Sequence, residues 1–113
     1  MSKLAEAIAH EEGFYVPGSL PSRDNNPGDL RHSPHSFHTS SDPNAIGIID
    51  SVADGWADLE HQLQLYASRG MTVEQMVYEY APPSENNSAA YLDYVCRYVG
   101  CASSTLVSDA LKL

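Results

Sequence analysis

The segment from Ser51 to Gly70 has the strongest periodicity in the chain and limits the fold more than any other feature. Its apolar residues recur every three or four positions and form one stripe, made of Val52, Trp56, Leu59, Leu63 and Tyr66. Ser51 can cap the start of a helix, and Gly70 follows the last apolar position. The segment therefore predicts a long amphipathic helix with Trp56 in the core.

One shorter helix is expected before this segment, and another after it. Residues 3–12 show helical spacing of apolar side chains, and Gly13 follows directly as a stop signal. Thr72 opens a capping-box pattern that predicts another helix start. That helix must end before Pro82, because two consecutive prolines remove hydrogen-bond donors and oppose helical geometry.

A further helix is expected from about residue 88 to residue 99, where Gly100 supplies the stop. Its inward face is expected to consist of Leu92, Val95, Cys96 and Val99. A short terminal helix around residues 105–111 completes the set. The C-terminal third is therefore predicted to be helical throughout.

The stretch from Gly18 to Asn44 differs in kind, because Pro, Ser, Asn, Asp, Gly and His dominate it and periodicity disappears. A compact domain rarely keeps so long an irregular stretch unless that stretch lines a binding site. The brief apolar run 46–49 predicts a short strand or extended segment. Together these patterns predict a mainly α fold: one compact domain over residues 1–113, with about five helices and one long polar loop.

The composition and the first residues bear on membrane insertion and on secretion. The chain has 113 residues, of which 42% are hydrophobic, and no run of about 18 apolar residues, so we expect no membrane insertion. The first residues carry no secretory leader, so the chain is expected to leave the cell by another route or to come from a larger protein. Its location is left open.

The net charge of −9 comes from six basic and fifteen acidic residues. Such a charge repels nucleic acid and anionic membranes, and no basic cluster offsets it locally. We therefore expect no nucleic-acid partner. The same charge counts against an anionic cell-wall substrate, so charge alone leaves the substrate open.

Glu11 and Glu12 close the first expected helix where the polar stretch opens. A carboxylate at a helix C-terminus meets the negative end of the helix dipole, and Phe14 and Tyr15 can partly remove it from water. Both effects disfavour ionisation, as a general acid near neutral pH requires. The alternative is that both glutamates simply belong to a helix surface.

Two polar segments could bind a ligand rich in hydroxyl groups. One runs from Arg23 to Arg31 and contains Asn26-Pro27-Gly28, and the other runs from Tyr80 to Asn87 on a Pro-Pro frame. An aromatic ring beside amide and acid groups suits a carbohydrate. Each segment also has a purely structural interpretation: the first as a turn, and the second as a loop that is stiffened by prolines and caps the next helix.

The histidines and cysteines do not predict a metal site or a cofactor. His32, His35 and His38 are three residues apart, but Pro34 breaks the segment, and we interpret them as solvated loop side chains. Cys96 and Cys101 lack the spacing of zinc or redox sites. We expect one core thiol and one loop thiol, and a local disulfide remains an alternative.

Four motifs together resemble phage and bacterial lysozyme-like proteins, and more narrowly the small murein lytic transglycosylase-type domains of phage-related proteins. They are Ala7 to Tyr15, Asn25 to Arg31, Gly55-Trp56, and Tyr80 to Asn86. The resemblance covers about residues 4–107. It implies a lysozyme-like fold with minimal β structure, and cleavage of the β-1,4 bond between N-acetylmuramic acid and N-acetylglucosamine in peptidoglycan.

The resemblance also implies roles for single residues. The Glu12-Gly13-Phe14 step matches the family's catalytic glutamate, which ends a helix and protonates the glycosidic oxygen, with Glu11 as the weaker candidate. The sugar cleft would be lined by the Asn-Pro-Gly loop and the Tyr-Ala-Pro-Pro segment. The substrate-binding candidates there are Asn26, Arg31, Tyr80, Ser84 and Asn86.

The chain departs from the pattern in two places. Pro21 and Pro27 stand about where the best-known phage lysozymes carry an Asp and a Thr, so we favour a one-glutamate mechanism. Asp29 replaces an Asn that is frequent in related loops. A hydrolase would need a base such as Asp24 or Asp29, whereas a transglycosylase would not. The non-enzymatic alternative is a structural or glycan-binding module of a phage virion or tail with the same fold.

Overall fold

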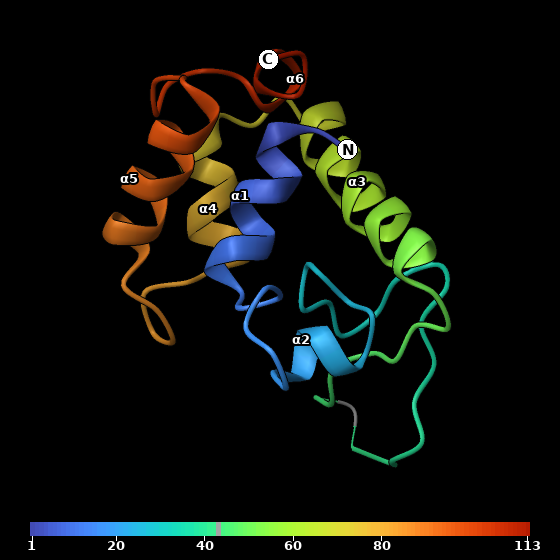
Figure 1. The fold of residues 1–113 in the computed structure, drawn as a ribbon. Coiled ribbons are helices and arrows are strands. Elements are labelled where there is room, and N and C mark those ends of the chain that lie inside the picture. The colour runs from blue at the N-terminus through green and yellow to red at the C-terminus, as the bar shows by residue number, and fades with distance from the viewer. Residues whose placement is uncertain (43) are drawn as a thin grey trace.

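A computed structural model describes residues 1–42 and 44–113 and confirms the mainly α fold (Figure 1). Within these residues the β structure is limited to two isolated bridges, Phe37 with Ile48 and Thr72 with Leu106. The run 46–49 is thus an extended segment and forms no sheet there. The helices are α1 (Lys3–Glu11), α2 (Leu20–Arg23), α3 (Val52–Ser68), α4 (Val73–Tyr80), α5 (Ser88–Val99) and α6 (Val107–Ala110).

Side-chain caps explain where the longer helices begin. The Ser2 hydroxyl accepts from the Ala5 N–H at 3.1 Å, and the Ser51 hydroxyl accepts from the Asp54 N–H at 3.1 Å. At α4 the predicted capping box is complete, because Thr72 and Gln75 each accept from the other's backbone N–H. Each cap satisfies a backbone donor that the first helical turn leaves free.

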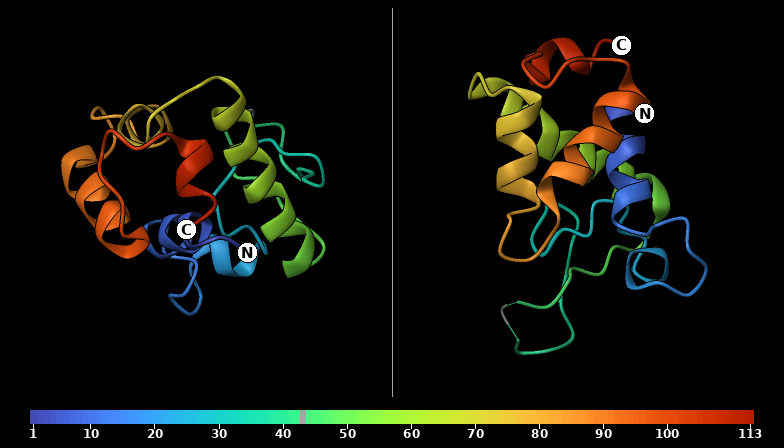
Figure 2. Two further views of the ribbon diagram at one scale, coloured as in Figure 1. Left: turned by 90° about the horizontal axis from the view of Figure 1, so that it is seen from above. Right: turned by 90° about the vertical axis from the view of Figure 1, so that its left-hand side faces the viewer.

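The apolar faces of α1, α3, α4 and α5 meet in one core, and α6 lies across the end that also holds both termini (Figure 2). Leu59, Leu63 and Tyr66 of α3 are buried there as predicted, and Trp56 is half-buried against the core. The expected stripe is wrong at Val52, which remains 44% exposed. Burial of these apolar faces is the main favourable term that holds the helices together.

The inward face of α5 differs from the prediction. Val95 and Val99 are buried as expected, and so are Tyr91 and Ser88, while Leu92 and Cys96 are only half-buried. Tyr91 combines a large apolar ring with one hydroxyl, so it can enter the core where a polar partner is available. That partner is Glu12, as the candidate site shows.

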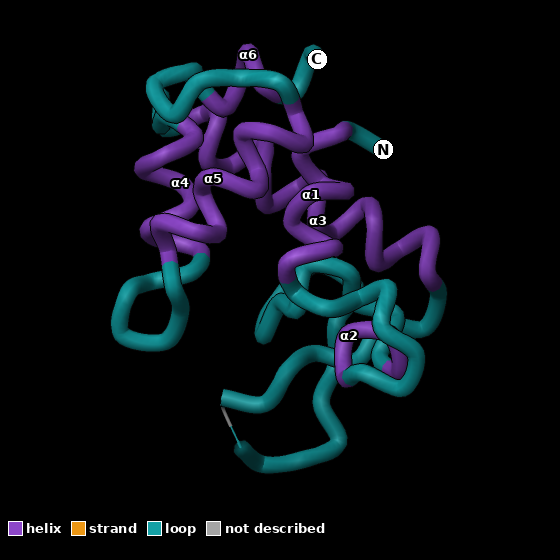
Figure 3. The backbone as a smooth tube through the Cα atoms, turned by 60° about the vertical axis from the view of Figure 1, so that its left-hand side comes forward, coloured by secondary structure: helices purple, strands orange, loops and turns teal. Residues whose placement is uncertain are grey.

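The polar stretch is more ordered than predicted. Its helix α2 is capped by Ser19 and buries Pro21, so the expectation of an irregular stretch from residue 18 to residue 44 is wrong over residues 20–23. Pro43, within the same expected stretch, lies outside the described residues. Figure 3 shows α2 and the long loops gathered at the end of the molecule away from both termini.

Within the described residues, no helix has the length and apolar character needed to cross a membrane.

Candidate active site

A cleft of about 400 Å³ lies where the C-terminal end of α1, the polar stretch, α3 and α4 meet. Its volume falls in the range typical of small-molecule sites. It is lined by Glu12, Gly28, Asp29, Leu30, Arg31, Ile46, Gln62, Tyr66, Glu79, Tyr80, Glu85 and Asn86. Segments that are far apart in the sequence therefore converge on one cavity, and Glu12 is part of its wall.

Glu12 is the residue that ends α1, and its side chain is half-buried in this cleft. The hydroxyl of Tyr91 donates to its Oε2 at 2.8 Å. Burial raises the pKa of Glu12 to about 7; the Tyr91 hydrogen bond opposes this rise, whereas Asp29 and Glu11 add to it. Near neutral pH this carboxyl holds its proton for a substantial part of the time, as a general acid must.

The neighbouring glutamate has a different environment. Glu11 is exposed and does not line the cleft. Phe14 and Tyr15 do not line it either; Phe14 packs edge-on against Trp56, with the ring centroids 5.5 Å apart. Of the two glutamates, therefore, only Glu12 is placed to meet a ligand bound in the cleft.

Asp29 lines the same cleft as Glu12, and a hydrogen bond between the two carboxyl groups affects the pKa of each. Its backbone has a φ of 53°, in the left-handed region that few residues other than glycine adopt. Burial raises the pKa of Asp29 to about 6, and the positive charge of Arg31 and the hydrogen bond with Glu12 limit the rise. The cleft thus holds two carboxyl groups that both titrate near neutral pH.

Asn26 supports the loop that presents Asp29. Its Nδ2 donates to the carbonyls of Leu30 at 2.7 Å and Gly47 at 2.9 Å, and its Oδ1 accepts from the Leu30 N–H at 3.0 Å. The side chain has no exposed surface. The structure therefore places Asn26, predicted to contact a substrate, behind the cleft, with its amide enclosed and already bound within the loop.

The other predicted binding residues fall into two groups. Arg31, Tyr80 and Asn86 line the cleft, and the Nε of Arg31 also donates to the Asn44 carbonyl at 3.1 Å. Ser84 is exposed and is not part of the cleft wall. Tyr80 is turned inward, and its hydroxyl donates to the carbonyl of Gly28. The structure therefore brings three of the five candidates together around Glu12.

Sequence reasoning missed several residues of the site. Tyr91 is the most important, because it is the direct partner of the Glu12 carboxyl. Gln62 and Tyr66 enter from α3, and Glu79 enters from α4. A tyrosine at a helical core position is one signal that could have indicated a buried polar partner for Tyr91. For the rest, the contacts depend on how distant segments fold together.

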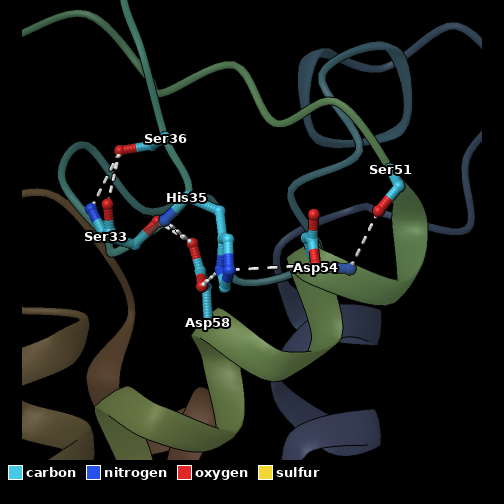
Figure 4. Close-up of polar contacts among 6 residues, drawn as sticks. All are labelled: Ser33, His35, Ser36, Ser51, Asp54 and Asp58. Carbon is cyan, nitrogen blue, oxygen red and sulfur yellow. Dashed lines mark hydrogen bonds and ion pairs between the residues drawn. The ribbon is translucent and has the colours of Figure 1, made fainter.

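A second polar cluster fixes the outer part of the polar stretch to α3 (Figure 4). The buried Asp58 carboxylate accepts from the Ser33 hydroxyl at 2.6 Å, from the His35 N–H at 2.9 Å and, at 2.5 Å, from the His35 ring Nδ1. The other ring nitrogen of His35 lies 3.9 Å from Asp54, one turn earlier on α3. His35 is thus an exposed loop residue, as interpreted, whose ring and backbone also bind Asp58.

The two cysteines are free and both half-buried against the core. Cys101 lies in a loop as expected, whereas Cys96 on α5 is not the fully buried core thiol that was expected. Burial raises the pKa of Cys96 to about 11 and thus keeps its thiol protonated near neutral pH. Across residues 1–42 and 44–113, no three side chains of His, Cys, Asp or Glu gather as a metal site would require.

No protein-family model matches this chain, and no curated protein or solved structure matches it either.

Proposed function

We propose that this chain cleaves the β-1,4 bond between N-acetylmuramic acid and N-acetylglucosamine in peptidoglycan, as a lytic transglycosylase with Glu12 as its catalytic acid. The observation that carries the proposal is the placement of Glu12 in the wall of a cleft, where burial raises its pKa to about 7. A carboxylic acid that is still protonated near neutral pH can protonate a glycosidic oxygen.

In the first step, the Glu12 carboxyl gives its proton to the glycosidic oxygen while the bond from that oxygen to the anomeric carbon breaks. Positive charge develops on the sugar ring, and the leaving sugar departs with a new hydroxyl group. In the second step, the Glu12 carboxylate takes the proton of the substrate's own 6-hydroxyl, whose oxygen bonds to the anomeric carbon. The product is a 1,6-anhydro sugar, and Glu12 is protonated again.

The position of Asp29 favours this route over hydrolysis. Glycosidases that use water hold their two carboxyl groups about 5–5.5 Å apart when they retain configuration and about 6.5–9.5 Å apart when they invert it. Asp29 instead hydrogen-bonds to Glu12 itself, which is not the arrangement of either pair of carboxyl groups. Asp24, the other candidate base, does not line the cleft. A mechanism that needs only one carboxyl therefore suits the site better.

The rest of the cleft wall suits a glycan chain. Gln62, Asn86 and Arg31 supply donors and acceptors for hydroxyl and N-acetyl groups, and the ring of Tyr66 supplies an apolar surface. Arg31 is the basic side chain on this wall and can pair with a carboxylate of the peptide that peptidoglycan carries.

The test is digestion of purified peptidoglycan by the wild type and by Glu12→Gln, with products identified by mass spectrometry. Wild type should release 1,6-anhydro products and Glu12→Gln should release none, while Glu11→Gln, a matched change of the exposed neighbour, should remain active. Reducing-end products would make the enzyme a hydrolase. An inactive, folded wild type that still binds glycan would instead assign the chain to a non-catalytic module of a phage particle or of a larger protein.

A further inference from the structure

The loop that carries Asp29 is built to hold one conformation. Asn25 and Asp29 both have a φ of 53°. The Asp29 N–H donates to the Asn26 carbonyl at 3.0 Å, and the Asn26 side chain joins the loop to the carbonyl of Gly47. Asn and Asp adopt this left-handed conformation more readily than other non-glycine residues, so both positions suit the turn that the loop makes.

Two helices brace this loop from behind. Tyr80 of α4 donates its hydroxyl to the Gly28 carbonyl. A Cβ atom on Gly28 would lie 2.7 Å from the Tyr80 hydroxyl oxygen and 2.9 Å from a Leu59 methyl carbon, so the loop is packed directly onto both helices. At Gly55 of α3, an added Cβ would lie 2.0 Å from the Asn25 carbonyl oxygen. These contacts fix the backbone of the loop next to Asp29, which lines the same cleft as Glu12.

We propose that Asp29 is a positioning residue that keeps the catalytic proton on Glu12 through a carboxyl–carboxylate pair, and that this pair sets the upper pH limit of glycan cleavage. Only the statement about the pH limit of glycan cleavage rests on the proposed function, and the carboxyl–carboxylate pair does not. Two carboxyl groups in direct contact cannot both ionise without strong repulsion, so they share one proton over a range of pH.

The other groups around the pair divide into those that raise and those that lower its proton affinity. Glu11 at the end of α1 raises the pKa of Glu12, and Asp24 raises that of Asp29. The Tyr91 hydroxyl of α5 and the Arg31 guanidinium oppose them. The remaining ionisable groups of the cleft wall are Tyr66, Glu79, Tyr80 and Glu85. With pKa values of about 7 for Glu12 and about 6 for Asp29, the pair holds one proton between these values, mainly on Glu12.

The pair serves both steps of the proposed reaction. Before the first step, the Asp29 carboxylate favours the protonated form of Glu12. After Glu12 has given its proton away, two negative charges face each other, and their repulsion makes Glu12 a stronger base toward the 6-hydroxyl of the substrate. Above about pH 7 both groups lose their protons, the acid is absent, and cleavage should decline.

The test is a carbon-13 NMR titration of the Glu12 carboxyl in wild type and in Asp29→Asn, followed by pH–rate profiles of both on peptidoglycan. Asparagine tolerates the left-handed backbone conformation and carries no charge, so the variant should fold. The Glu12 titration should move down by about one pH unit, and the alkaline limb of the rate profile should move with it. Glu85→Gln removes another carboxylate from the same cleft wall and should leave the Glu12 titration in place.

An unmoved Glu12 titration in Asp29→Asn would overturn the proposal. Wild type supplies a second check that does not depend on the variant, because in a coupled pair each carboxyl carbon reports both protonation steps. Two independent single-step curves would overturn the proposal as well. The NMR titration requires no enzymatic activity. It therefore tests the coupling between Glu12 and Asp29 independently of whether the protein cleaves peptidoglycan.

Discussion

Replacing Glu12 by Gln should make the protein more stable at alkaline pH, although it removes the catalytic acid. The pKa of Glu12 is raised from 4.5 to about 7, so the folded chain holds this proton more tightly than the unfolded chain does. Between these values the stability of wild type falls as the pH rises. This change of stability with pH has the opposite sign to that caused by a carboxylate in a salt bridge, whose pKa is lowered by folding.

The size of the effect follows from the shift. One pKa unit corresponds to about 1.4 kcal/mol, so the rise of the Glu12 pKa from 4.5 to about 7 is worth about 3 kcal/mol when the group is fully ionised. Water in the open cleft screens part of this, which leaves about 2–3 kcal/mol. Glutamine is neutral at every pH, has nearly the same shape, and can still accept from the Tyr91 hydroxyl.

Urea unfolding of both proteins across the pH range measures this difference directly. The two unfolding free energies should nearly coincide at about pH 4 and differ by about 2–3 kcal/mol in favour of Glu12→Gln at about pH 8. Glu85→Gln changes a more exposed glutamate on the same cleft wall, and its unfolding free energy should depend on pH in the same way as that of wild type. A gap for Glu12→Gln that does not change with pH would refute the argument that burial raises this pKa.

Two further substitutions test the partners of the site. Tyr91→Phe removes a donor that favours the Glu12 carboxylate, so the NMR titration of Glu12 should move to higher pH; a move to lower pH would contradict the assigned role. Asp58→Asn should lower the unfolding free energy by about 1–3 kcal/mol in urea titrations, because it weakens three hydrogen bonds. The folded pKa of Asp58 is lowered and that of His35 is raised, so the loss should be largest between these two pKa values.

Most of the helical framework follows from local signals. The apolar stripe of α3 and the capping box at Thr72 are patterns whose causes lie within a few residues, and the structure has both elements where these patterns predict them. Helix α2 has only four residues, Leu20–Arg23, too few to show a period of 3.6. Its Ser19 cap and the proline in its first turn were the available signals.

The candidate site was predictable only where one segment defines it. Glu12 stands out because a carboxyl at a helix end borders a polar stretch. Asn26 shows the limit, because an amide that binds a sugar and an amide that clamps a loop look the same in sequence. Tyr91 is 79 positions from Glu12, and only the packing of α5 against α1 brings the two side chains together.

The role of Glu12 as the acid of a glycan-cleaving cleft is tested most directly by mass spectrometry of peptidoglycan after incubation with wild type or Glu12→Gln. Both proteins should be shown to be folded at the pH of the digestion. Wild type should release 1,6-anhydro products, and Glu12→Gln should release none. Equal product from a folded Glu12→Gln variant would contradict this role of Glu12.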